Sequence, residues 1–134
     1  MSATPVVMAP ADVVPAMAML RSVEHDAIVA LVVSWVEPPL FVATLRPFFG
    51  ETILLWSHTI YQENGVGLTL GALPAAGVLR ETLEEMEVRF VFVYGMPLGG
   101  EPALMDAVRS FARAAAARAK ERTASISAGS PGMP

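Results

Sequence analysis

Apolar residues along this chain follow two kinds of pattern, one typical of buried strands and one typical of amphipathic helices. Three segments are almost continuously apolar and rich in β-branched or aromatic residues: 26–35 (DAIVALVVSW), 52–58 (TILLWSH) and 88–95 (VRFVFVYG). Uninterrupted apolar strands are typical of a parallel sheet that is covered on both faces. We therefore predict a parallel strand over each of these segments.

Helical patterns precede, separate and follow the three strands. Asp12 is expected to cap a helix over 13–22, in which Pro15 is tolerated in the first turn. The segment 38–49 (PPLFVATLRPFF) has apolar residues near one face, and Pro47 is expected to end or kink its helix. We thus predict two short helices before the second strand.

Two longer helices are predicted in the second half of the chain. The helix over 71–87 carries an apolar stripe made of Ala76, Leu79, Leu83 and Met86. The helix over 101–122 carries a stripe made of Leu104, Val108, Phe111, Ala112 and Ala115. Its acidic residues lie near its start and its basic residues near its end, an order that suits the helix dipole.

Strands that alternate with helices predict an α/β fold, here a small parallel sheet flanked by helices, flavodoxin- or Rossmann-like, and truncated at both ends. PVVMAP (5–10) looks like the end of a fourth strand, and SISAGSPGMP (125–134) looks like the start of another. We expect residues 1–124 to form an incomplete N-terminal α/β domain. Residues 125–134 are expected to begin a second domain that is cut off.

Composition narrows the class of protein. Hydrophobic residues make up 54% of the 134-residue chain and charged residues only 16%, so either both faces of the sheet are buried or apolar surface meets a partner. The formal charge of −4 and the lack of a basic stripe argue against nucleic acid. Without cysteine, disulfide and thiolate chemistry is excluded. With no signal-like N-terminus and no membrane-length apolar run, the expected location is the cytoplasm.

Ligand sites of α/β sheets form in the loops after the strands. Polar and aromatic residues gather in the loops after the first two predicted strands: Trp35, Glu37, Trp56, His58, Thr59, Tyr61, Gln62, Glu63 and Asn64. Structural roles are the alternative for three of them. Trp35 could cover the core, His58 could be a hydrogen-bonded residue at a strand end, and Gln62 could belong to a turn before Gly65. His25 and Asp26 begin a strand and are expected to be solvated.

The residues reveal no Ser/His/Asp set, close carboxylate pair or metal cluster, so they predict no catalytic residue. GVGLTLG (65–71) lacks the spacing of a dinucleotide fingerprint. PLGGEP (97–102) precedes a helix N-terminus, but Glu101 argues against anion binding there. From the residues alone, the chain is an α/β module that contacts a partner.

A succession of segments resembles the N-terminal region of the L-fucose/L-arabinose isomerase family. The segments are DAIVALVVSWVEPP, ETILLWSHT, GVGLTLGALPAAGVLRETLEEMEVRFVFVYG and PALMDAVRSFARAAAARAKERTASISAGSPGM, which together cover most of the chain from about Pro10. RFVFVYG and SISAGSPGM fit the family pattern. GLTLGA stands where the family has an N-S-L-C-G-type loop, so that Asn and Cys are missing here.

The resemblance implies that the chain is the N-terminal fragment of an aldose–ketose isomerase. In this family a divalent metal, usually manganese, polarises the sugar oxygens while carboxylates move the proton. The family's Glu, Asp and His ligands lie in later domains, so no metal ligand or catalytic residue is assigned to this chain. The resemblance further implies a homo-oligomer in which this domain helps to close a sugar pocket. Trp35 would stack on the sugar, and His58 and Gln62 would bond its hydroxyls.

Two other interpretations stay open. The chain could be a stand-alone flavodoxin-like binding or oligomerisation module without enzymatic activity, whose apolar excess is an interface. It could also bind a flavin or nucleotide at YGMPLGGEP (94–102). None of the three interpretations involves nucleic acid or a membrane.

Overall fold

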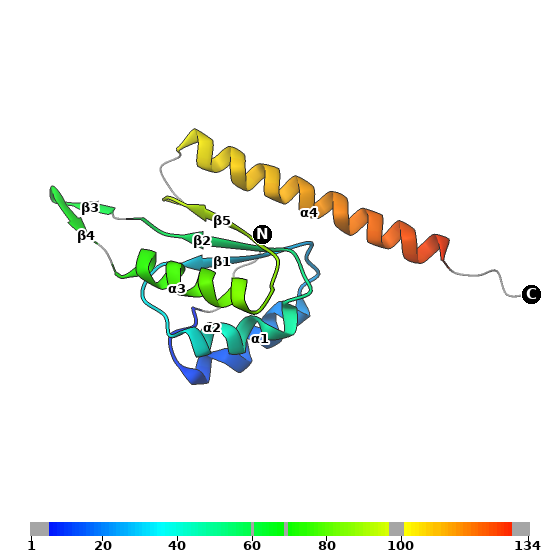
Figure 1. Ribbon diagram of the computed structural model, residues 1–134, viewed down its shortest axis with the longest axis horizontal. Helices are drawn as coiled ribbons and strands as arrows, with labels where there is room; N and C mark the ends of the chain where they lie inside the picture. Colours follow the sequence, from blue (N-terminus) through cyan, green and yellow to red (C-terminus); the bar gives the residue numbers. More distant parts are fainter. Residues whose placement is uncertain (1–5, 60, 69, 97–100, 130–134) are drawn as a thin grey trace, which may run out of the picture.

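The computed structural model describes residues 6–59, 61–68, 70–96 and 101–129. Within them a parallel sheet separates two helical layers, with three helices on one face and one long helix on the other (Figure 1). The sheet has the order β1-β2-β5, and its strands are β1 (Ile28–Val32), β2 (Ile53–Ser57) and β5 (Phe90–Tyr94). The predicted α/β fold with a small parallel sheet is thereby confirmed.

The remaining elements follow the predicted order with one addition. The helices are α1 (Pro10–Ser22), α2 (Pro38–Leu45), the short 3-10 helix η1 (Arg46–Phe48), α3 (Ala72–Glu85) and α4 (Pro102–Ala128). Between β2 and α3 the chain forms an antiparallel hairpin of β3 (Tyr61–Glu63) and β4 (Val66–Leu68). The α2 helix ends two residues before Pro47, which has no N–H to continue the helical hydrogen bonds, and Arg46 keeps helical angles as η1 begins.

The first core lies between the sheet and α1, α2 and α3. In α3 the residues that face the sheet recur at helical spacing, and they are Ala72, Ala75, Ala76, Leu79 and Leu83. They pack on Ile28 and Val32 of β1 and on Leu55 of β2, each at most 5% exposed. Met86 follows the end of α3 and is 41% exposed, so its predicted place in the stripe is wrong.

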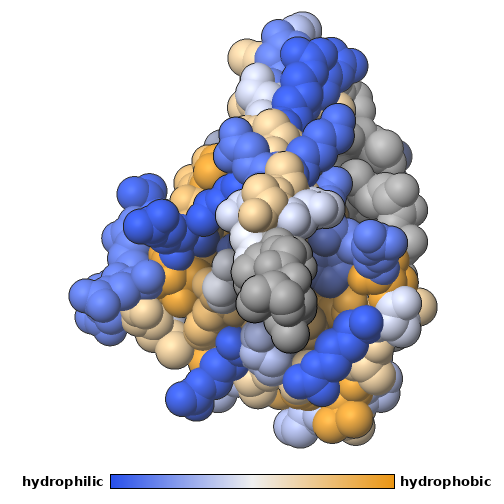
Figure 2. Space-filling model, turned by 90° about the vertical axis from the view of Figure 1, so that its right-hand side faces the viewer, coloured by the Kyte–Doolittle hydropathy of each residue, from blue (hydrophilic) through white to orange (hydrophobic). Residues whose placement is uncertain are grey.

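The second core lies under α4, where Leu104 and Phe111 pack on Leu54, Trp56 and Val93. Val108 packs at its margin, whereas Ala112 is exposed and does not belong to the stripe as predicted. The helix covers only part of this face of the sheet, because Val29, Leu31 and Val33 are 40%, 43% and 41% exposed. Figure 2 likewise shows apolar surface between hydrophilic side chains on the outside of the molecule.

Both ends of the described chain differ from the predicted strands. Residues Ser125–Ala128 continue α4, so a strand that begins at Ser125 is wrong; residues 130–134 lie outside the described residues. An alanine-rich run precedes this segment within α4, and the helix that it favours extends through Ser125–Ala128. At the other end Val6–Met8 form no strand, and residues 1–5 are not described. The division at residue 124 stays a prediction.

Asp12 stabilises the start of α1, but not as the N-cap that was predicted. The helix begins at Pro10, which places Asp12 in its first turn. Its Oδ2 accepts hydrogen bonds from the backbone N–H of Met8 at 2.9 Å and of Ala9 at 2.8 Å. These two bonds lower the pKa of the Asp12 carboxyl. The residue therefore caps the N-terminus from inside the helix, as the acidic member of a capping box does.

None of the described helices is both long enough and apolar enough to cross a membrane.

Candidate functional site

The carboxyl ends of the three parallel strands meet at one edge of the sheet, where the predicted site residues were expected. The ladder continues one residue past β2, because the His58 N–H donates to the Val32 carbonyl at 2.9 Å. The Gly95 N–H likewise donates to the Ser57 carbonyl at 3.0 Å. These bonds bring the segments that follow β1, β2 and β5 to one edge, and with them Trp35 and His58.

Trp35 is fixed at its backbone and through its indole N–H but keeps much of its ring exposed. Its backbone N–H donates to the Leu70 carbonyl at 2.7 Å, and its indole N–H donates to Glu37 Oε1 at 3.0 Å. The side chain is 48% exposed. An apolar ring that is held in place and exposed at a strand end is a surface on which a ligand can stack.

Gly71 permits the close approach of the loop after β4 to Trp35. Its φ of +77° belongs to the left-handed region that glycine adopts without cost. A Cβ at this position would lie 3.3 Å from the Cβ of Trp35. The start of α3 and the loop after β1 are therefore in direct contact at this edge.

His58 lies half-buried at the end of β2, where its ring orientation is set by a short hydrogen bond. Nδ1 lies 2.6 Å from the Thr59 carbonyl oxygen. Because a carbonyl only accepts, Nδ1 carries the proton in this contact. The backbone therefore fixes the orientation of the imidazole ring at the end of β2.

Two hydroxyl groups that sequence patterns did not single out as partners join β2 and β5 at this edge. Thr59 Oγ1 lies 2.9 Å from the hydroxyl of Tyr94, which is 43% exposed. Tyr94 was missed because it closes an apolar strand, where it looks like a core aromatic. Its place at the end of β5, where it pairs with Ser57 at the end of β2, could have identified it as a residue of the carboxyl edge.

Trp56 and Ser57 have structural roles at the same edge. The buried indole of Trp56 donates to the Gly95 carbonyl at 3.0 Å. Ser57 is fully buried, and its hydroxyl donates to the His58 carbonyl at 3.1 Å. That hydroxyl is therefore engaged with the backbone.

Gln62 lies in the hairpin, which extends away from the main sheet (Figure 1). It pairs with Gly67 across the two strands, and its side chain lies outside the described residues. The hairpin was interpreted as a loop, although Asn64-Gly65 signals a tight hairpin turn. Both turn residues have positive φ, at 52° and 77°. The structure thus brings Trp35 and His58 to one edge, while the role of Gln62 stays a prediction.

The described part of the chain holds no group of three His, Cys, Asp or Glu side chains placed to bind a metal ion. The residues at the edge therefore do not fit a manganese site by themselves. What the edge offers is one aromatic face, one carboxylate, one imidazole and a Thr–Tyr hydroxyl pair. Groups of this kind bind and orient a hydroxyl-rich ligand.

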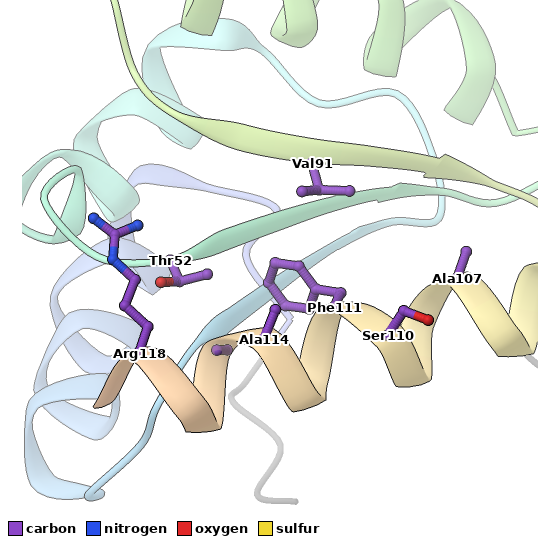
Figure 3. A pocket seen from close by; sticks show the side chains of 8 residues that line it. Thr52, Val91, Ala107, Ser110, Phe111, Ala114 and Arg118 are labelled. Carbon is purple, nitrogen blue, oxygen red and sulfur yellow. The ribbon is translucent and has the colours of Figure 1, made fainter. Parts of the chain in front are cut away.

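Two hollows of the described surface lie elsewhere. One, of about 390 Å³, lies between α4 and the sheet and is lined by Phe111, Val91 and small side chains, with Arg118 beside Thr52 at one end (Figure 3). It is shallow and almost wholly apolar, and neither Trp35 nor His58 lines it. Trp35, at the carboxyl edge, is 48% exposed, so this part of the edge is open to solvent.

His25 was expected to be solvated, but it forms a half-buried contact at the opposite edge of the sheet. Its Nε2 lies 2.6 Å from Glu51 Oε2, and its Nδ1 lies 2.7 Å from the Val23 carbonyl. The Val23 carbonyl, with Glu51 and Asp26 adding to it, raises the pKa of His25 above its ordinary value of 6.5, although burial opposes the shift. This contact ties the segment before β1 to the segment before β2.

Exchanging His25 for Gln is expected to cost more stability in mild acid than in mild base. A raised pKa in the folded state means that the charged ring stabilises the fold below its unfolded pKa, and that this contribution is lost as the pH rises through the folded pKa. We expect a loss of about 1 kcal/mol near pH 5.5 and a smaller loss near pH 8.5. Urea unfolding of both proteins at the two pH values measures this, and equal losses would contradict the assignment.

Searches for related proteins found no matching family model, curated protein or solved structure.

Proposed function

We propose that the carboxyl edge of the sheet binds a sugar, and that this chain is the N-terminal α/β region of an aldose–ketose isomerase of the L-fucose/L-arabinose type. The observation that carries the proposal is the half-exposed Trp35 indole, which is held by Glu37 at the end of β1. Apolar faces of sugar rings pack on aromatic side chains, while their hydroxyls need donors and acceptors nearby.

Polar groups at the same edge of the sheet suit the second requirement. Glu37 accepts hydrogen bonds, the Thr59–Tyr94 pair both donates and accepts, and the His58 imidazole lies at the same edge. A monosaccharide presents several hydroxyls, each of which donates and accepts. The mixed set at this edge therefore matches a polyol better than a phosphate or a planar cofactor.

The isomerase chemistry itself is assigned to residues outside this chain. The divalent metal of such an enzyme, usually manganese, polarises the carbonyl and hydroxyl oxygens of the sugar when it is bound. The described residues contain no ligand group for it. In this proposal Trp35 stacks on the sugar ring, while His58 and Gln62 orient its hydroxyls.

L-Fucose and L-arabinose are expected to bind the purified chain weakly, with a Kd of roughly 1–10 mM, because an open site buries little of a small ligand. Calorimetric titration measures the affinity directly. Trp35→Ala is expected to weaken binding at least about tenfold by removing the stacking face. Leu73→Ala serves as the matched control, because Leu73 is equally exposed at 48% and lies on α3.

The outcomes separate stacking from binding in general. If Trp35→Ala binds as tightly as the native chain, the stacking role is wrong even though a sugar site exists. If neither sugar produces saturable heat up to about 50 mM, the sugar-binding proposal itself is wrong. The chain would then be better described as a module whose exposed apolar residues meet another protein.

A further inference from the structure

The β5 strand lies at an edge of the sheet, and within the described residues no strand pairs with its outer side. Within the described residues its one neighbour in the sheet is β2. Its sequence, Phe90–Tyr94 (FVFVY), contains no charge, proline or glycine. Proteins usually protect such edges with charged side chains, proline or a bulge. An unprotected apolar edge is therefore a place where a further strand adds.

The direction of the backbone groups shows which residues are available for pairing. The Gly95 N–H points to β2, since it donates to Ser57. Backbone groups of a strand alternate from side to side, so the N–H and C=O of Phe90, Phe92 and Tyr94 point to the open edge. An antiparallel partner must present residues of matching orientation opposite these three.

We propose that the partner at this edge is a second copy of this chain, paired antiparallel through β5 about a two-fold axis at Phe92. This register sets Phe92 opposite Phe92 and Phe90 opposite Tyr94 of the second copy. All three residues with outward backbone groups then face residues of the same orientation in the second copy, and each pair exchanges both of its hydrogen bonds. A shift by one residue would set outward groups against inward ones.

The side chains in this register are complementary on both faces. Phe90, Phe92 and Tyr94 lie on the α3 side of the sheet, where aromatic pairs across strands stabilise a sheet. On the α4 side, Val91 faces Val93 of the second copy. Arg89 falls opposite Gly95, so no like charges meet along the strand. The other open edge, β1, has Ala30 at its centre and no aromatic residue.

The surface beside β5 also leaves room for a second copy. A hollow of about 540 Å³ borders this edge and is lined by Arg80, Glu84, Val88, Arg89, Phe90 and Phe92. Arg80 and Glu84 form an ion pair at 2.9 Å, and the Arg80 guanidinium lies 5.7 Å from the centre of the Phe92 ring. This pair is neutral as a whole, and Arg89 adds one positive charge that falls opposite Gly95 in the proposed register.

Sedimentation at increasing protein concentration tests the proposal, with Val91→Lys and Val29→Lys as a matched pair. Both valines lie beside Leu54 on the same face of the sheet, and they are 46% and 40% exposed. The native chain is expected to reach twice its mass of 14.2 kDa. Val91→Lys is expected to weaken the dimer at least about tenfold, because a charged side chain would be buried against Val93. Val29→Lys should leave it unchanged.

Single-cysteine variants test the pairing register. They also test the dimer independently if Val91→Lys does not fold. The native chain has no cysteine, so each variant carries one thiol. Phe92→Cys is expected to form an interchain disulfide under mild oxidation, because directly opposed residues have Cα atoms about 5.5 Å apart. Ala30→Cys, at the centre of β1, should not. A monomer up to about 200 µM, a dimer broken by Val29→Lys, or crosslinking through Ala30→Cys alone would overturn the proposal.

Discussion

Replacement of Leu79 by Ala is expected to lower the free energy of unfolding by about 3 kcal/mol, the largest effect of any single exchange considered. Leu79 is fully buried between α3 and the sheet, within the core that also holds Leu55 and Leu83. Truncation removes buried methyl groups and leaves a cavity that the close-packed surroundings fill only in part. Denaturant unfolding followed by circular dichroism measures the change.

Leu73→Ala is the control for this exchange, since it makes the same chemical change on the same helix. Leu73 is 48% exposed, so its truncation is expected to cost less than about 0.5 kcal/mol. A loss of similar size for both variants would contradict the placement of the α3 stripe. It would mean that α3 does not turn Leu79 toward the sheet.

Replacement of Gly95 by Ala is expected to destabilise the protein by about 2 kcal/mol. Gly95 has a φ of +148°, a conformation that residues with a Cβ rarely adopt. An added Cβ would lie 2.5 Å from Cδ2 of Leu104, a buried side chain of the second core. Thermal and denaturant unfolding give the change in stability, and the indole fluorescence of Trp56 reports on its bond to the Gly95 carbonyl.

Gly77→Ala is expected to act in the opposite direction, with a gain of about 0.5–1 kcal/mol. Gly77 lies inside α3, where a Cβ would meet nothing within 4 Å. Alanine lowers the entropy of the unfolded chain and favours helix at such a position. If Gly95→Ala were as harmless as Gly77→Ala, the turn after β5 would not have the conformation described here.

The layered arrangement could be predicted from sequence because its strands and helices carry strong and different patterns. The β2 strand is buried at all five positions, and its nearly continuous apolar run predicted a buried strand. The stripe of α3 follows from the spacing of Leu79 and Leu83. These patterns report burial, which is why they locate the core more reliably than the ends of elements.

The features that could not be predicted depend on contacts between segments far apart in the chain. His25 was expected to be solvated because its contact with Glu51 spans 26 residues. The hydrogen bond between Thr59 and Tyr94 joins residues 35 positions apart, so no local sequence pattern predicts it. The helical conformation of Ser125–Ala128 was missed for another reason, since SISAGSPGMP was interpreted from its own pattern as the start of a strand. The hairpin was missed although Asn64-Gly65 indicated it.

The two proposals use different surfaces of the molecule and can fail separately. The sugar site lies at the carboxyl edge around Trp35, whereas pairing through β5 depends on its open side and on Phe92. Tyr94 contributes to both, because its hydroxyl contacts Thr59 and its backbone faces the open edge. A dimer that forms without sugar, and sugar binding that persists in Val91→Lys, would show that the two functions are independent.

The most direct test of sugar binding at the carboxyl edge is a nuclear magnetic resonance titration of the two indole N–H signals. Trp35 is half exposed and Trp56 is buried, so one signal lies within the proposed site and the other serves as an internal reference. Addition of L-fucose or L-arabinose is expected to shift the Trp35 signal saturably while the Trp56 signal stays in place. An unmoved Trp35 signal at saturating sugar would contradict the proposed function.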